Sequence, residues 1–215
     1  MARGAFIVLE GGEGAGKTTQ AALLSRWLDA AGVAHRVTRE PGGTAVGEAV
    51  RSVVLDRTDL AMPPASELFL YLTSRAAFVA EIVRPALDGG EVVVADRFDL
   101  STLAYQGYGR GLPLDGVRSA VALATGGLRP DLTVLLDLPV DDGAARQRSA
   151  GLVEDRIEQE GADFLRRVRD GYLALAAADP DVVVVSAAGT PTEVHRRIVD
   201  VLRARLPETF PEAGV

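Results

Sequence analysis

Apolar residues along this chain of 215 residues form two alternating kinds of pattern. Short continuous runs rich in valine and leucine are typical of strands that are buried on both faces of a parallel sheet. Longer stretches have apolar residues every three or four positions, which is the spacing of amphipathic helices. Strands are predicted at 6–9, 35–38, 92–95, 132–138 and 182–186, and helices at 18–31, 44–56, 65–88, 113–125, 139–150, 161–178 and 190–206.

The alternation of strands and helices predicts an α/β fold, a doubly wound, five-stranded parallel sheet flanked by helices. Pro85 lies inside a predicted helix and should kink or split it, because proline cannot donate the backbone hydrogen bond of a helix interior. No repeat or change of composition marks a second domain, so we expect a single domain over residues 1–207. Proline residues follow the last predicted helix, and residues 208–215 are therefore expected to form a flexible tail.

A glycine-rich segment between the first strand and the first helix carries the strongest chemical signal. Residues 11–18 read Gly-Gly-Glu-Gly-Ala-Gly-Lys-Thr and fit G-x-x-x-x-G-K-[ST], the pattern of a phosphate-binding P-loop. Lys17 is the only lysine in the chain. Backbone N–H groups would surround the phosphates of a nucleoside triphosphate, Lys17 would reach its terminal phosphates, and the Thr18 hydroxyl would bind Mg²⁺. The expected ATP-binding residues are Gly11, Gly12, Glu13, Gly14, Ala15, Gly16, Lys17, Thr18 and Thr19.

A second signal lies at the end of the third predicted strand, where Asp96 and Arg97 follow an apolar run. An apolar strand that ends in aspartate is typical of the carboxylate that holds Mg²⁺ beside a P-loop, although such an aspartate can also simply cap the next turn. Ligands of open α/β sheets bind at the carboxyl ends of the strands. We therefore expect Lys17, Asp96 and Arg97 to converge.

Two polar segments after predicted strands carry further arginines. The segment 38–44 follows the second strand, and Arg51 lies on the helix after it. These arginines are either solvated or form a clamp for a second phosphate, because a planar guanidinium can hold two phosphate oxygens at once. The arginine-rich segment 143–158 is either a solvated charged segment or a lid that brings arginines over ATP.

Tyr71 and Arg75 are four residues apart on the predicted helix 65–88 and so share one of its faces. They form either a surface cation–π pair or a platform on which a nucleobase stacks while the guanidinium donates to its carbonyl. A separate apolar stripe on the same helix should face the core and consists of Leu68, Leu72, Ala76 and Val79.

Composition narrows the range of functions. A net charge of −7 argues against nucleic acid or an anionic membrane as the main partner. The chain has no cysteine, and therefore neither disulfides nor thiolate metal sites. No apolar run is long enough to span a bilayer and no signal peptide is recognisable, so the cytoplasm is the expected compartment.

In their order along the chain, these segments resemble the bacterial thymidylate kinases of the nucleoside monophosphate kinase superfamily, from about residue 5 to residue 203. The motifs are Phe-Ile-Val-Leu-Glu-Gly-Gly-Glu-Gly-Ala-Gly-Lys-Thr-Thr-Gln at 6–20, Thr-Arg-Glu-Pro-Gly-Gly-Thr at 38–44, Asp-Arg-Phe-Asp-Leu-Ser-Thr-Leu-Ala-Tyr-Gln-Gly at 96–107, Arg-Pro-Asp-Leu-Thr-Val-Leu-Leu-Asp at 129–137 and Asp-Arg-Ile-Glu at 155–158. The resemblance implies ATP- and Mg²⁺-dependent phosphorylation of dTMP to dTDP, which supplies dTTP synthesis. It also implies a homodimer built from packed helices.

The resemblance also implies roles for residues that would hold dTMP. Glu13 would accept the 3′-hydroxyl of the deoxyribose. Arg39, Arg51 and Arg97 would contact the acceptor phosphate, and Arg97 would also reach toward the transferred group.

At the base, Tyr71 occupies the place of a stacking residue that is usually phenylalanine in the family. Arg75 would donate to thymine O4, and Thr102 would contact thymine N3. Tyr105 would crowd the 2′ position and so favour deoxyribose. Phe98 stands where the family often has tyrosine or histidine, so any hydrogen bond from that side chain is absent here.

The resemblance also implies a catalytic arginine. Bacterial members without an arginine in the P-loop use an arginine of the lid, and the P-loop of this chain has none. Arg148 is the candidate, which would act with Lys17 and Arg97, and Arg146 or Arg156 are alternatives.

Two rival functions are compatible with a P-loop. The chain could phosphorylate another deoxynucleotide or nucleoside, or it could be a switch protein that uses nucleotide binding to control a partner. GTPase switches read guanine with Asn-Lys-x-Asp, which this chain cannot contain because its sole lysine lies in the P-loop. The acceptor-side motifs favour a kinase.

Overall fold

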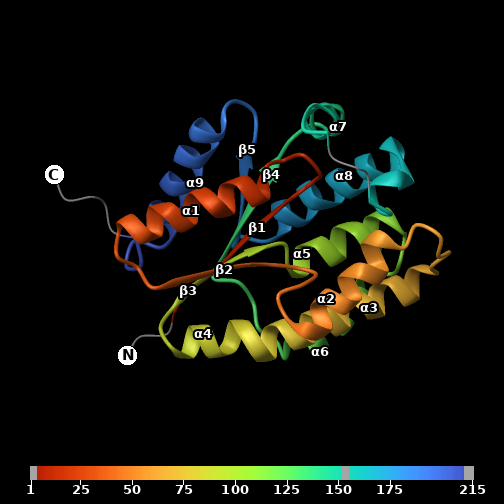
Figure 1. Cartoon of the computed structure of the whole chain (residues 1–215), viewed down its shortest axis with the longest axis horizontal. Helices are drawn as coiled ribbons and strands as arrows, with labels where there is room; N and C mark the ends of the chain where they lie inside the picture. The colour runs from red at the N-terminus through yellow and green to blue at the C-terminus, as the bar shows by residue number, and fades with distance from the viewer. Residues whose placement is uncertain (1–3, 152–154, 211–215) are drawn as a thin grey trace.

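A parallel sheet forms the centre of the structure, a computed structural model that describes residues 4–151 and 155–210 (Figure 1). Its strands are β1 (Phe6–Gly11), β2 (His35–Arg39), β3 (Val92–Asp96), β4 (Leu132–Asp137) and β5 (Val182–Ser186). Within the described ranges they pair in the order β2-β3-β1-β4-β5, and every pair is parallel. The predicted α/β fold with a doubly wound, five-stranded sheet is therefore confirmed.

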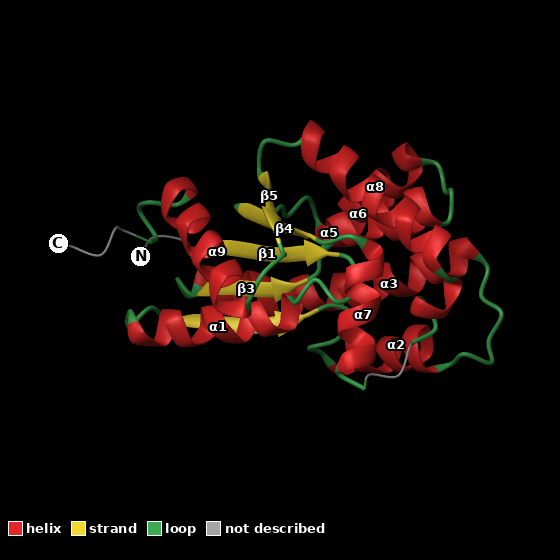
Figure 2. Cartoon of the chain, turned by 90° about the horizontal axis from the view of Figure 1, so that it is seen from above, coloured by secondary structure: helices red, strands yellow, loops and turns green. Residues whose placement is uncertain are grey.

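The strand order reverses around β1, which lies between β3 and β4. In open α/β sheets such a reversal opens a crevice at the carboxyl ends of the strands, where ligands bind. Figure 2 shows the arrowheads of the strands pointing toward α3 (Pro64–Phe78) and α7 (Val140–Ser149), so these helices lie near the expected crevice.

Helices cover both faces of the sheet because successive residues of β1 point to opposite sides. Ile7 and Leu9 pack with α1 (Lys17–Ala30) and α9 (Pro191–Arg205), whereas Phe6 and Val8 are buried on the other side. That second face is covered by α3, α4 (Arg84–Asp88), α5 (Asp99–Thr102), α6 (Leu114–Thr125) and α8 (Ala162–Ala178). The continuous apolar character of the strand follows from this two-sided burial.

Wider π-helical turns interrupt two of the predicted helices. The helix predicted at 44–56 consists of α2 (Ala45–Arg51) followed by the π turn η1 (Ser52–Asp56). The helix predicted at 65–88 is divided into α3, the π turn η2 (Val79–Val83) and α4, and Pro85 lies in the first turn of α4. A first turn tolerates a residue that cannot donate, so the predicted effect of Pro85 is confirmed.

Two details of the helix predictions are wrong. The sequence pattern predicted no helix between residues 99 and 109, yet α5 and the π-helical η3 (Leu103–Gly109) lie there. Residues 100–107 are all buried, so their apolar side chains show no helical period. On α3, Ala76 is exposed, whereas Arg75 is buried beside the predicted apolar stripe.

The C-terminal segment is packed further than predicted. Phe210 is buried against Trp27 of α1, with ring centroids 5.4 Å apart. The flexible tail predicted for residues 208–215 therefore does not begin at residue 208, because this aromatic contact holds the chain to α1. Residues 211–215, and residues 152–154 of the predicted lid, lie outside the described residues.

Candidate functional site

A cavity of about 600 Å³ opens at the carboxyl ends of the strands. One part is lined by residues 13–20 of the P-loop and α1, and another by residues of α3, α5 and η3. The predicted site residues that line it are Glu13, Gly14, Ala15, Gly16, Lys17, Thr18, Thr19, Arg39, Arg51, Tyr71, Arg75, Asp96, Arg97, Thr102 and Tyr105. The structure therefore brings residues from five separate sequence segments to one cavity.

Lys17 begins α1 and is buried in the P-loop. Its ammonium group donates to the carbonyl oxygens of Gly11, at 3.0 Å, and Gly12, at 2.8 Å. Burial, with the nearby positive charge of Arg97, lowers the pKa of Lys17. These carbonyls hold the lysine in place, and a phosphate group is a stronger partner for the same charge.

Thr18 and Asp96 meet at the start of α1 and the end of β3. The Thr18 hydroxyl donates to Asp96 Oδ2 at 2.7 Å, as expected if both side chains serve one ion. Mg²⁺ is commonly held by one or two carboxylates together with substrate phosphates and water. The described residues include no cluster of three or more acidic or histidine side chains that could hold a metal alone. This donor set fits a Mg²⁺ ion that arrives with a nucleotide.

Arg97 follows Asp96 in a left-handed backbone conformation, with φ 74°. Such a conformation is costly for a residue with a side chain and is often found at functional sites. The guanidinium bonds to Glu13 and donates to Gly11 O at 3.1 Å and to Tyr172 Oη at 3.2 Å. Arg97 therefore lies directly against the P-loop.

The carboxylate of Glu13 accepts hydrogen bonds from Arg97 and from the Tyr105 hydroxyl, the latter at 2.8 Å. Burial alone raises the pKa of Glu13, but the charges of Arg97 and Lys17 outweigh that effect and hold the pKa at about 2. Glu13 is thus ionised and accepts hydrogen bonds at any physiological pH.

Arg75 is buried and stacks over the ring of Phe98 at 5.3 Å. Its Nε donates to Glu40 Oε2 at 2.8 Å, Nη1 to Thr102 Oγ1 at 2.5 Å and Nη2 to Phe98 O at 2.8 Å. Burial raises the pKa of Glu40 to about 7, although Arg75 opposes this. The guanidinium has five N–H groups, and two of them make no hydrogen bond to the described residues and could donate to a ligand in the cavity. The alternative of a surface cation–π pair between Tyr71 and Arg75 is wrong, because Arg75 is buried and stacks on another ring.

Arg39 and Arg51 line the cavity beside Pro41. Arg39 is exposed and pairs with Glu48 at 3.2 Å, while Arg51 donates to Pro41 O at 3.0 Å. An exposed ion pair of this kind is weak, so the Arg39 guanidinium can leave it for a phosphate.

The predicted lid arginines lie in three different environments. Arg146 of α7 lines the cavity and donates to Gly14 O at 3.3 Å and to Ala187 O at 2.9 Å. Arg148 is exposed, and the lining of the cavity does not include it. Arg156 is buried, donates a hydrogen bond to Glu67, and is likewise absent from the lining. In the described part of the lid, Arg146 is therefore the arginine nearest to the P-loop.

Residues 9–198 match the profile of the family described as thymidylate kinase. The chain belongs to the thymidylate kinase family.

Individual relatives agree with the family profile. A thymidylate kinase of Synechococcus sp. (strain JA-2-3B'a(2-13)) is 52% identical over 203 residues, which cover 94% of this chain and 96% of the relative. One from Desulforudis audaxviator is 58% identical over 179 residues, covering 82% and 80%. The crystal structure of thymidylate kinase from Ehrlichia chaffeensis superposes with a TM-score of 0.75 at 30% identity, covering 93% of this chain and 99% of that one.

The family match confirms the resemblance inferred from the motifs. Members of the thymidylate kinase family transfer the γ-phosphoryl group of ATP to dTMP in a Mg²⁺-dependent reaction. Membership identifies an enzyme, which argues against the alternative of a switch protein. The family assignment also agrees with the topology, because the neighbouring structure has the same α/β architecture.

Some residues at the site were missed by sequence reasoning. Glu10 is fully buried on β1 and accepts from the backbone N–H of Phe98 at 2.8 Å and the hydroxyl of Tyr172 at 2.8 Å. It thereby fixes the turn that holds Arg97. The position of Glu10, directly after an apolar run, was a signal in the sequence that this residue could have a role at the site. No sequence pattern connected Tyr172 with Glu10, which lies 162 positions earlier.

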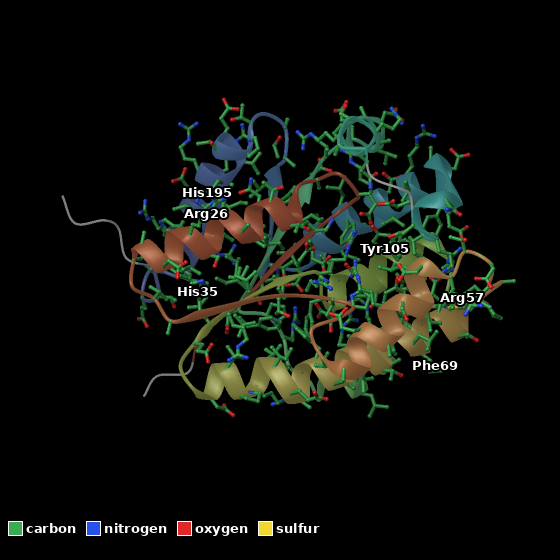
Figure 3. All side chains as sticks on the ribbon, viewed as in Figure 1. Arg26, His35, Arg57, Phe69, Tyr105 and His195 are labelled. Atoms are coloured by element: carbon green, nitrogen blue, oxygen red, sulfur yellow. The ribbon has the colours of Figure 1, made fainter. Side chains whose placement is uncertain are left out.

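The two histidines of the chain take no part in the cavity lining. Figure 3 shows His35 and His195 near α1 and α9, far from Tyr105. Among the described residues, no helix is both long and apolar enough to cross a membrane.

Proposed function

We propose that this chain transfers the γ-phosphoryl group of ATP to dTMP within the one cavity, with a donor subsite at the P-loop and an acceptor subsite at α3, α5 and η3. The observation that supports this most directly is that Arg97 and Glu13, which bond to each other, lie where the two parts of the cavity meet. A donor and an acceptor phosphate would therefore approach each other beside Lys17 and Arg97.

In the donor subsite, the backbone of residues 11–16 and Lys17 would hold the ATP phosphates. Thr18 and Asp96 would hold Mg²⁺, which neutralises charge that develops between the β- and γ-phosphates. Thr19 would complete the contact at the first turn of α1, where the field of the helix favours an anion.

In the acceptor subsite, Arg39, Arg51 and Arg97 would bind the phosphate of dTMP. Glu13 would accept the 3′-hydroxyl, and Tyr105, which bonds to Glu13, would crowd the 2′ position. The chemistry supports this division, because the guanidinium groups face an anion while the carboxylate faces a hydroxyl donor.

Recognition of the base would fall to Tyr71, Arg75 and Thr102. The two free N–H groups of Arg75 suit the O4 carbonyl of thymine, and would face the amino group of cytosine. Thr102 Oγ1 already accepts from Arg75 and can accept a second bond from thymine N3–H. The ring of Tyr71 supplies an apolar surface for stacking.

The reaction needs no strong general base. The nucleophile is a phosphate oxygen that is ionised at neutral pH, because the second pKa of a phosphate ester is about 6. The barrier lies in bringing two anionic groups together, so catalysis would come from positioning and from positive charge. Lys17, Arg97 and one arginine of α7 would supply that charge, and the position of Arg146 makes it a better-supported choice than Arg148.

We also propose that the chain is a single cytoplasmic domain that forms a homodimer, and the contact of Phe210 with Trp27 supports extending this domain beyond the expected residues 1–207. Neighbouring helices α2, α3 and α6 expose apolar side chains on their outer surface. Phe69 is 63% exposed and Leu123 is 86% exposed, and exposed apolar side chains on neighbouring helices suit an interface.

A substrate panel tests the proposed activity. The protein is incubated with MgATP and each deoxynucleoside monophosphate, and ADP release is measured in a coupled assay. We expect turnover with dTMP to exceed turnover with dCMP by at least about tenfold, the effect of one unpaired buried polar group. Equal rates would contradict the assignment of the acceptor, and ADP release that needs no acceptor would favour a switch ATPase.

A further inference from the structure

Glu67 of α3 is fully buried outside the cavity and bonds to side chains from two other segments. Its Oε1 accepts from Gln106 at 2.9 Å and from Arg110 Nε at 3.1 Å. Its Oε2 accepts from Arg110 Nη2 at 2.9 Å and from Arg156 Nη2 at 2.6 Å. Both oxygens are therefore saturated, and the Arg110 contact is bidentate.

Arg156 links this carboxylate to a further element. Its Nε donates to Val54 O at 2.7 Å, and its backbone N–H donates to Leu55 O at 3.0 Å, both in η1. The side chain is only 8% exposed. Arg156 therefore fastens the segment that begins at residue 155 onto η1 and α3, and it does not reach the cavity.

The charges of this network balance. Arg110 Nη1 also pairs with Glu160 at 2.6 Å, so two arginines face two carboxylates. Burial alone raises the pKa of Glu67, but the hydrogen bonds from Arg110, Gln106 and Arg156 lower it overall, and the carboxylate stays charged. A buried charge network that is fully paired is rigid, whereas removing one partner leaves uncompensated charge.

The residues around this network form the acceptor side of the cavity. Tyr71 lies one helical turn after Glu67 on the same face of α3, and Gln106 bonds to Glu67 directly. Leu55, whose carbonyl accepts from Arg156, and Ile157, which follows Arg156, also line the cavity. Neither Glu67 nor Arg156 bonds to the P-loop in the described residues.

We propose that Glu67 is a positioning residue for the acceptor subsite: through Gln106 and Arg156 it fixes the wall against which the monophosphate binds, and it leaves the ATP subsite unaffected. The inference rests on the proposed assignment of the two subsites. It also gives Arg156 a role different from that of a catalytic arginine, because its guanidinium is committed to Glu67 and Val54.

Equilibrium titrations of the full chain with dTMP, and separately with a non-hydrolysable ATP analogue and Mg²⁺, test this role. The variants are Glu67→Gln, Arg156→Met and the double variant. We expect each single variant to weaken dTMP binding by about tenfold and analogue binding by less than about twofold, because only the acceptor wall is released. The double variant should bind dTMP no more weakly than the single variant with the lower affinity, since both changes break the same link.

Glu160→Gln is the matched control. It belongs to the same network, but its side chain is 34% exposed, and it should change dTMP binding by less than about twofold. Thermal unfolding of every variant identifies those that fold at the titration temperature, and Arg156→Met supplies the measurement if Glu67→Gln does not fold.

Equal weakening of both ligands would overturn the proposal, because that is the effect of general destabilisation. Unchanged dTMP binding in both single variants would also overturn it. Wild-type turnover with dTMP tests the proposed function separately, so an active wild type with unaffected variants would refute only the role of Glu67.

Discussion

At the scale of single residues, base selectivity depends on the hydrogen bonds that Arg75 has left to offer. We expect Arg75→Ala to reduce the preference for dTMP over dCMP by about one to two orders of magnitude, the effect of one buried polar group that loses its partner. The measurement is the ratio of kcat/KM for the two substrates. A ratio equal to that of the wild type would show that Arg75 does not read the base.

The selectivity ratio is preferable to the rate because Arg75 is also part of the buried structure. Its removal leaves Glu40 without its cation, and the pKa of Glu40, already about 7, would rise further so that the carboxyl becomes neutral. Arg84→Ala is a matched control, because Arg84 bonds to backbone carbonyls of Thr125 and Gly126 outside the cavity.

Glu13 gives a prediction about pH. Its pKa lies near 2 in the folded protein, below the ordinary value of 4.5, so its ionised form stabilises the fold. That contribution is complete above pH 4.5 and is lost as the pH falls toward 2. We expect wild type to be more stable than Glu13→Gln at pH 6, and the difference to shrink steadily below pH 4.5. Urea unfolding at several pH values measures it, and a difference that does not change with pH would be inconsistent with a lowered pKa.

At the scale of elements, α7 rests directly on the P-loop, backbone against backbone. A Cβ added to Gly143 would lie 2.3 Å from the carbonyl oxygen of Glu13, and Gly14 on the other side leaves equally little room. We expect Gly143→Ala to displace α7 or the P-loop and to lower kcat/KM for ATP by about tenfold or more, the scale of an overpacked contact. Steady-state kinetics with ATP varied provides the measurement.

Gly116→Ala on α6 is the control for this substitution. A Cβ there meets nothing within 4 Å, so alanine should leave kinetics unchanged and stabilise the helix slightly. If both substitutions had the same kinetic effect, the close approach of α7 to the P-loop would not matter for ATP binding.

The catalytic arginine of the lid can be identified by substitutions on α7. Arg146 bonds to the P-loop carbonyl of Gly14, whereas Arg148 lies outside the cavity lining and Arg156 is committed to Glu67. We expect Arg146→Ala to lower kcat by about a hundredfold, as for other single electrostatic groups at a reaction centre, and Arg148→Ala to have a small effect. A large loss at Arg148 would mean that α7 rotates during the reaction, and equally mild effects would mean that no lid arginine is catalytic.

Sequence patterns predicted the elements that obey a simple period and missed those set by tertiary contacts. The strands followed from apolar runs, and the P-loop followed from a motif whose residues are neighbours in the chain. The helical segment from Asp99 to Gly109 escaped because burial on all sides removes the period. Partners such as Glu10 with Tyr172, or Glu67 with Arg156, are distant in sequence and are brought together only by the fold.

At the scale of the whole molecule, charge is distributed unevenly. The chain has a net charge of −7, yet the cavity contains Lys17 and several arginines that face the predicted phosphates. Within the cavity the field is set by these near charges, because more distant surface charges are screened by salt. An acidic protein can therefore bind two anionic substrates, and its surface still disfavours nucleic acid.

The outer surface of α2, α3 and α6 carries the final prediction. Ala65, Phe69 and Ala76 are exposed at helical spacing on α3, on a different face from the buried Arg75 (Figure 3 labels Phe69). If this surface is the dimer interface, a charge at its centre would be buried without a partner, and Phe69→Asp should shift the protein from dimer to monomer. Light scattering coupled to gel filtration measures the mass.

Val184→Asp is the matched control, because Val184 is also apolar and 45% exposed but lies on β5, away from α3. That variant should remain dimeric. The monomeric variant should also lose part of its dTMP affinity, since α3 supplies Tyr71 and Arg75 to the acceptor subsite and its packing against a second copy would hold it in place. Two outcomes would contradict this prediction: a wild type that is monomeric at all concentrations, and a Phe69→Asp variant that stays dimeric. Either one would show that the exposed apolar residues of α3 do not form an interface between copies of this chain.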